Sequence, residues 1–126
     1  RIDRRPIDFD KIERATLELA SRYDRVLVEG AGGLMVPLTE DFLTIDYVAQ
    51  KRYPLVFVTS GKLGSINHTL LSFEAIQRRG ITLDTVLYNL YPPVKDTTIQ
   101  EDTQAYIQRY LEKYFPGTHF LTVPVL

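Results

Sequence analysis

Hydrophobic residues along this chain follow two different spacings, which alternate from one end to the other. Some stretches repeat apolar residues every three or four positions, the spacing of a helix that packs one side on a core. These stretches are residues 8–23, 44–52, 66–79 and 98–114. Other stretches are short continuous apolar runs, typical of buried strands. These runs are residues 25–29, 55–59, 83–91 and 119–123.

Residues that favour helix ends support these boundaries. Asp8 can cap the first helix, and Gly80 can close the third. Thr98 and Glu101 have the spacing of a capping box at the start of the fourth helix, which Pro116-Gly117 would end. Apolar side chains of the first two helices should face inward. They are Ile12, Ala15, Leu19, Ala20 and Tyr23, followed by Ile45, Val48 and Ala49.

Alternation of helices and strands predicts an α/β fold with one parallel sheet and right-handed crossovers. The run at 55–59 has no polar alternation, so this strand should be covered on both faces. Four strands would make a thin sheet with open edges.

Each predicted strand ends in residues that are poorly suited to a core. Glu29-Gly30-Ala31-Gly32-Gly33 follows the first strand, and Ser60-Gly61-Lys62-Leu63-Gly64-Ser65 follows the second. Asn89 lies at the end of the third strand and Pro124 follows the fourth. Open α/β sheets bind ligands beyond the carboxyl ends of their strands, so these residues predict a binding site at one edge.

Glu29 is the acidic group at this predicted edge. A carboxylate that enters an apolar core costs several kcal/mol unless it is paired or bound to a metal. It could be a Mg²⁺ ligand or a general base, and Gly30, Gly32 and Gly33 would let a ligand approach the backbone. The structural alternative is a strand-end glutamate in solvent beside a glycine-rich turn.

The segment from Gly64 to Asn67 would place free backbone N–H groups at a helix start, where a carboxylate or phosphate can bind. The alternative is ordinary capping by Ser65 or Asn67. Asn89 offers a donor and an acceptor, the pair that can read an adenine edge. Its alternative is a turn-forming asparagine before Pro92-Pro93.

Other candidate groups point more to structure than to chemistry. Lys62 precedes the second glycine of its loop, so the loop is not a phosphate-binding P-loop, and none occurs in these 126 residues. Lys62 is interpreted as a solvated turn residue. His68 has no nearby partner for a dyad or a metal set and suits packing or hydrogen bonding. The tyrosines of the last helix recur at helical spacing, which suits a core or an interface.

Composition narrows the function classes. The chain has 126 residues, enough for one domain, with a net charge of −1 that does not favour nucleic acid or an anionic membrane. There is no cysteine, which excludes disulfides and thiolate metal sites and fits the cytoplasm. No apolar run approaches the ~20 residues that span a bilayer. Because the chain begins with Arg1, we expect a fragment or a processed product.

Two longer motifs resemble those of dethiobiotin synthetases. They are Val-Glu-Gly-Ala-Gly-Gly-Leu-Met-Val-Pro-Leu at 28–38 and Lys-Leu-Gly-Ser-Ile-Asn-His-Thr-Leu-Leu at 62–71. The ends of the strands at Asn89 and at Val123-Pro124-Val125-Leu126 follow in register, so the resemblance covers nearly the whole chain. It implies a P-loop NTPase-like fold, a three-layer parallel sheet with helices on both faces. Residues 1–126 would be the C-terminal part of one such domain.

The resemblance also implies a reaction and a set of site residues. These enzymes close the ureido ring of dethiobiotin from 7,8-diaminononanoate, CO₂ and ATP with Mg²⁺. By position, Glu29 resembles the Mg²⁺ ligand and Asn89 the adenine-binding residue, with Pro124 and Val125 beside the base. The substrate carboxylate would be held by Gly64, Ser65 and Asn67, at the active site of the partner subunit of a homodimer. Gly30, Gly32 and Gly33 would neighbour the phosphate loop.

The sequence also departs from these enzymes. Their P-loop, with its lysine and threonine, has no counterpart here, nor do a second lysine and a metal-binding aspartate. We therefore expect these 126 residues alone to be inactive. The additional substrate-binding tyrosine of the family is not placed, and Tyr106 is a candidate only by its position. Two alternatives stay open: a non-catalytic regulatory or dimerisation module, and a relative of the cobyrinic or cobyric acid amidating ligases.

Overall fold

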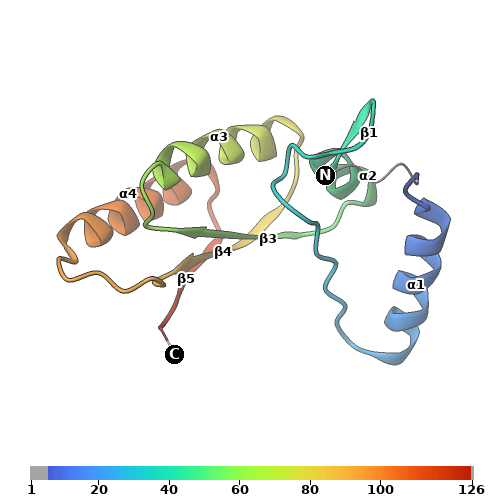
Figure 1. Cartoon of the computed structure of the whole chain (residues 1–126), viewed down its shortest axis with the longest axis horizontal. Helices are drawn as coiled ribbons and strands as arrows, with labels where there is room; N and C mark the ends of the chain where they lie inside the picture. The colour runs from blue at the N-terminus through green and yellow to red at the C-terminus, as the bar shows by residue number, and fades with distance from the viewer. Residues whose placement is uncertain (1–5, 126) are drawn as a thin grey trace. The chain divides into compact units, whose positions relative to one another are not determined.

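The computed structural model describes residues 6–125 of the chain. It consists of two compact units, Arg1–Tyr47 and Val48–Leu126, which are described separately (Figure 1). In the part of the chain that the structure describes, no helix is long and apolar enough to cross a membrane.

The first unit contains one long helix and a small hairpin. Helix α1 (Phe9–Arg22) begins where predicted, because the Asp8 carboxylate accepts a hydrogen bond from the Lys11 N–H at 3.0 Å. Strands β1 (Pro37–Thr39) and β2 (Phe42–Leu43) pair antiparallel, a hairpin that the hydrophobic pattern does not predict. The ring of Phe9 packs against those of Phe42 and Tyr47, with 5.8 Å between centroids in both pairs.

The prediction of a first strand at residues 25–29 is wrong. These residues run into the glycine-rich segment without forming a strand, and Leu27 is 90% exposed. A strand exists only through hydrogen bonds to a neighbouring strand. Among residues 6–125, β1 pairs with β2 and the remaining strands pair with one another, so 25–29 has no neighbour.

The predicted inward face of α1 is not buried either. The helix has no buried residue, and Leu19 and Tyr23 are 43% and 60% exposed. An apolar helical face needs an equally wide apolar surface to pack on. The hairpin β1–β2 is too small to provide one. The next helix, α2 (Thr44–Lys51), does bury Ile45 as predicted, together with Tyr47.

The second unit is the parallel α/β structure that the sequence predicts. Its elements alternate along the chain: β3 (Leu55–Ser60), α3 (Ser65–Arg78), β4 (Leu83–Asn89), α4 (Thr98–Tyr114) and β5 (His119–Val123). The strands form one sheet in the order β3-β4-β5, parallel throughout. The sheet has three strands rather than four, because residues 25–29 do not join it.

Helices α3 and α4 lie on the same side of this sheet (Figure 1). The core of the unit lies between the two helices and the sheet. Its fully buried aliphatic and aromatic side chains come from both helices and from β4: Phe73, Ile76, Val86, Tyr88 and Ile107. The Phe73 ring lies 5.6 Å from that of Phe57 on β3. The hydroxyl groups of Thr59 and Thr69 are buried but share a hydrogen bond of 2.6 Å, so neither lacks a partner.

The opposite face of the sheet is open in this unit. Val56 and Val58 of β3 are 44% and 60% exposed, and Leu121 of β5 is 56% exposed. The prediction that β3 is covered on both faces is therefore not met, although the parallel α/β class is confirmed. A continuous apolar run shows that both sides of a strand can be covered, but it does not show which segment covers them.

The start of α4 differs in detail from the predicted capping box. The N-cap is Thr97 rather than Thr98, and its hydroxyl donates to the Glu101 carboxylate at 2.9 Å. The Thr98 N–H donates to the Asp96 carboxylate, also at 2.9 Å. This bond lowers the pKa of Asp96 below its usual value. A run of Asp-Thr-Thr offers several capping oxygens, so spacing alone does not select one of them.

Candidate functional site

The carboxyl ends of the three parallel strands lie side by side, as the sequence predicts. Ser60 at the end of β3 is opposite Asn89 at the end of β4, and Asn89 is opposite Val123 at the end of β5. The chain continues from these ends into Gly61, Leu90 and Pro124. This is the edge at which open parallel sheets bind ligands.

Asn89 is half-buried at the middle of this edge. Its side-chain oxygen accepts a hydrogen bond of 3.0 Å from the Tyr91 N–H, which is the local turn proposed as the structural alternative. One oxygen lone pair and the amide NH₂ group remain for a ligand. Pro124 and Val125 are exposed directly after the neighbouring strand end. Turn formation and ligand binding are therefore compatible at Asn89.

The loop from Ser60 to Ser65 leads from this edge into α3. The N-cap of the helix is Gly64, with φ of 83°, which lacks a side-chain oxygen. The Ser65 hydroxyl lies 3.4 Å from that of Ser60 instead of capping the helix. The first-turn N–H groups of Ile66 and Asn67 have no acceptor within the helix. This helix start therefore has the features of an anion site.

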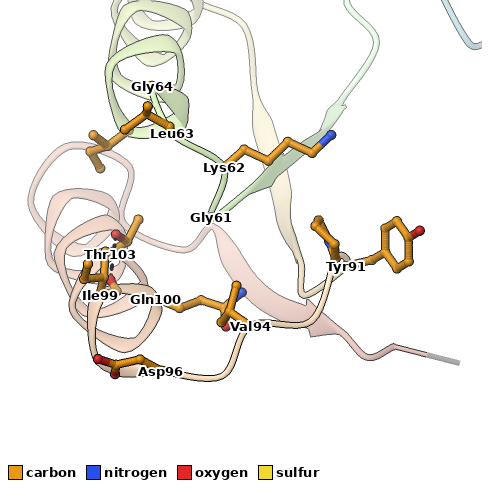
Figure 2. Close-up of a pocket in the computed structure, with 12 residues that line it drawn as sticks. Gly61, Lys62, Leu63, Gly64, Tyr91, Val94, Asp96, Ile99, Gln100 and Thr103 are labelled. Atoms are coloured by element: carbon orange, nitrogen blue, oxygen red, sulfur yellow. Dashed lines mark hydrogen bonds between the residues drawn. The ribbon is translucent and has the colours of Figure 1, made fainter.

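A cavity of about 380 Å³ lies beside this helix start. The β3–α3 loop forms one side of it, the segment after β4 a second, and the first turns of α4 a third (Figure 2). Leu63, Ile66, Val94 and Ile99 make most of the lining apolar. The volume and the polar helix end suit a small molecule with an apolar chain and one anionic group.

The other residues singled out in this region have less defined surroundings. In Figure 2 the side chain of Lys62 extends away from α4, and the residue is exposed, which fits the prediction of a solvated turn residue. His68 is exposed on α3, so a core-packing role for it is not supported. Tyr106 is 45% exposed and lines an adjoining open groove, which shares Ile99 with the cavity, under the guanidinium of Arg109. It does not line the cavity at the α3 start.

The predicted metal ligand, Glu29, lies in the first unit. Its side chain is exposed, at the end of the extended segment that does not form a strand. The glycines after it allow close backbone contacts, since a Cβ on Gly32 would lie 2.9 Å from Cγ2 of Val36, at φ of 84°. Among residues 6–125, no group of three or more acidic or histidine side chains could hold a metal ion. One exposed carboxylate still fits Mg²⁺, which keeps several waters and binds nucleotide phosphates.

Two residues that approach Gly61 were not identified from the sequence. Tyr88 precedes Asn89 in β4 and is fully buried, and burial raises the pKa of its hydroxyl. Gln100 lies in the first turns of α4 and lines the cavity. Neither belongs to a motif. Two features could have indicated them: the alternation of buried and exposed positions along β4, and the helical spacing along α4.

Comparison with known proteins gives consistent matches over the whole chain. A family described as an AAA domain matches residues 1–126. The ATP-dependent dethiobiotin synthetase BioD 2 of Pasteurella multocida is 50% identical over 120 residues, which are 95% of this chain and 56% of that protein. The protein of the same name from Haemophilus ducreyi is 47% identical over 122 residues, 97% of this chain and 57% of that protein.

A third organism gives a similar match. ATP-dependent dethiobiotin synthetase BioD of Chlorobaculum tepidum is 48% identical over 113 residues, 90% of this chain and 47% of that protein. The resemblance predicted from the two motifs is therefore confirmed. The chain spans about half the length of the curated relatives it matches.

Proposed function

The chain belongs to the AAA domain family, and from this premise we propose that it is part of a dethiobiotin synthetase. The complete protein would be an ATP- and Mg²⁺-dependent cyclo-ligase of biotin biosynthesis. It would form the ureido ring of dethiobiotin from 7,8-diaminononanoate and CO₂, in the cytoplasm. Residues 1–126 would be the C-terminal part of its single domain.

The observation that carries this proposal is the arrangement of three strand ends and one helix start. Ser60, Asn89 and Val123 align at one edge of a parallel sheet, and α3 begins beside them with free N–H groups. A nucleotide and an anionic substrate need such groups, an amide that can pair with a base and N–H donors for a carboxylate.

In this proposal Asn89 recognises adenine, with Pro124 and Val125 beside the base. Its turn with Tyr91 holds the amide in place, which lowers the entropy that binding would cost. The start of α3, with Gly64, Ser65 and Asn67, binds the carboxylate of 7,8-diaminononanoate. This helix start would serve the active site of the partner subunit in a homodimer.

Glu29 would supply one carboxylate ligand to Mg²⁺, and water and phosphate oxygens would complete the set. Bound Mg²⁺ would neutralise charge on the transferred phosphoryl group. Gly30, Gly32 and Gly33 would keep side chains away from the neighbouring phosphate loop. No P-loop sequence occurs in residues 1–126, so ATP turnover is expected of the complete protein and not of these residues alone.

The first test of this proposal is Asn67→Ala in the intact protein. Loss of one hydrogen bond to a carboxylate should raise the KM for 7,8-diaminononanoate roughly tenfold and leave the KM for ATP unchanged. Steady-state kinetics with each substrate varied in turn measures both constants. Gln77→Ala, an exposed position at the other end of α3, is the control. Equal increases in both KM values would mean that Asn67 has only a structural role.

The second test is Glu29→Gln, which keeps the shape of the side chain but removes its charge. Turnover should fall by roughly 100-fold or more, and added Mg²⁺ should restore it only in part, because a metal ligand is lost. Glu40→Gln, an exposed acidic residue of the same unit, is the control. Normal Mg²⁺ dependence in Glu29→Gln would remove Glu29 from the site.

A further inference from the structure

Tyr91 is an exposed aromatic residue two positions after the end of β4, and its side chain is 62% exposed. A single exposed aromatic residue is common on protein surfaces and needs no explanation by itself. This one, however, follows the edge of the sheet at which Ser60, Asn89 and Val123 align. Because parallel sheets bind ligands at this edge, the ring offers a flat apolar surface where a ligand is expected.

The backbone of Tyr91 is held close to the Asn89 amide. Its N–H donates to the Asn89 side-chain oxygen at 3.0 Å. The residue before it, Leu90, still pairs with β5, because its N–H donates to the Val123 carbonyl oxygen at 3.0 Å. Pro92 follows, and a proline restricts the backbone of the residue before it. The ring therefore moves mainly about its two side-chain torsions, so ordering it on a ligand costs little entropy.

The ring of Tyr91 and the cavity beside the α3 start lie in different directions. The residue contributes to the cavity wall, which the β3–α3 loop and the first turns of α4 also form. Figure 2 shows that the ring itself extends away from α4. The ring is therefore available to a ligand, or a part of one, that lies across the strand ends rather than in the cavity.

A planar base presents two kinds of surface to a protein. Its edge carries hydrogen-bond donors and acceptors, which a side-chain amide such as that of Asn89 can pair with. Its two faces are apolar π surfaces, which bind by stacking on an aromatic ring. The amide of Asn89 can serve only the edge of a base, and Tyr91, whose N–H is bound to that amide, carries an exposed ring that can serve a face.

We propose that Tyr91 stacks on the adenine ring of the nucleotide whose edge Asn89 binds. The amide selects the base, and the tyrosine ring adds affinity that does not depend on the identity of the base, because every base has a π face. This inference rests on the proposed function, because that function places adenine beside Asn89.

The test measures Kd by calorimetry in the intact protein, with Mg²⁺, for ATP and for tripolyphosphate, which lacks the base. Tyr91→Ala should weaken ATP binding roughly tenfold and leave tripolyphosphate binding unchanged. Tyr91→Phe keeps the ring and should bind ATP within about twofold of wild type. Tyr91→Leu keeps apolar bulk without a ring and should lose nearly as much ATP affinity as Tyr91→Ala. All three variants keep the backbone N–H that donates to Asn89.

Tyr114→Ala is the control, because this tyrosine is 41% exposed at the last residue of α4, and it should bind both ligands as wild type does. The inference is overturned if Tyr91→Ala binds ATP as tightly as wild type, or if it weakens ATP and tripolyphosphate equally. It is also overturned if Tyr91→Phe and Tyr91→Leu bind ATP with the same Kd. This last comparison decides the question if thermal unfolding shows that Tyr91→Ala does not fold.

The proposed function can fail separately from this inference. A wild-type protein that does not bind ATP would refute the proposed function, and the stacking role of Tyr91 with it. Wild-type binding of ATP that Tyr91→Ala leaves unchanged would overturn the stacking role alone.

Discussion

The two units of this protein carry the same kind of hydrophobic pattern and reach different degrees of burial. In the second unit, β3–β5, α3 and α4 bury a shared core that includes Phe73, Val86 and Ile107. In the first unit, α1 has no buried residue, and Leu27 in the apolar run after it is 90% exposed. An apolar pattern therefore predicts which face of a segment can be buried, but burial also requires an apolar surface on another segment.

The sharpest way to break this comparison is to truncate one aliphatic helical residue in each unit. Ile107 of α4 is fully buried, so Ile107→Ala should lower the free energy of unfolding by about 2–5 kcal/mol. Leu17 of α1 is 61% exposed, and Leu17→Ala should change it by no more than about 0.5 kcal/mol. Urea unfolding followed by circular dichroism measures both. A loss above 2 kcal/mol for Leu17→Ala would show that α1 is packed in solution.

The second unit was predictable because its elements are each other's partners. The boundaries of β5 agree with the predicted strand, and α3 differs from the predicted helix by one residue at each end. The alignment of Ser60, Asn89 and Val123 followed from parallel pairing alone, before any side-chain contact was known. The uncapped helix start at Gly64 followed in the same way from a glycine-rich loop that precedes a helix.

The first unit was less predictable for the same physical reason. Val26-Leu27-Val28 has the composition of a strand, but the hydrogen bonds that make a strand come from residues elsewhere in the chain. The hairpin β1–β2 was missed because its strands have only three and two residues, too few for a hydrophobic period. Tyr88 and Gln100 were missed because their proximity is tertiary and no local spacing encodes it.

Glycines provide a second comparison of packing density, with a smaller expected effect. An alanine at position 61 would place its Cβ 2.6 Å from the Tyr88 hydroxyl, so Gly61→Ala should cost about 1–3 kcal/mol. An alanine at position 33 would meet nothing within 4 Å, and Gly33→Ala should stay within about 0.5 kcal/mol of wild type. Thermal unfolding of both variants measures the difference. A neutral Gly61→Ala would contradict the close approach of Tyr88.

The smallest expected effect is a difference between two tyrosines in how the free energy of unfolding depends on pH. Burial raises the pKa of Tyr88 above its usual value of 10.0, so the folded state holds this proton more tightly than the unfolded state does. The resulting stability is fully present below about pH 10 and is lost as the pH rises through the higher folded-state pKa. Tyr88→Phe removes this contribution to the pH dependence, so the unfolding free energy of the variant should fall less steeply than that of wild type above about pH 10.

Tyr23 in the first unit is 60% exposed, and Tyr23→Phe should follow the wild-type curve. Urea midpoints between pH 8 and pH 11, on the order of six points per protein, resolve the two slopes. If Tyr88→Phe and wild type fell in parallel, Tyr88 would be hydrated in solution, and the contrast between the two units would not extend to the strand end beside Asn89.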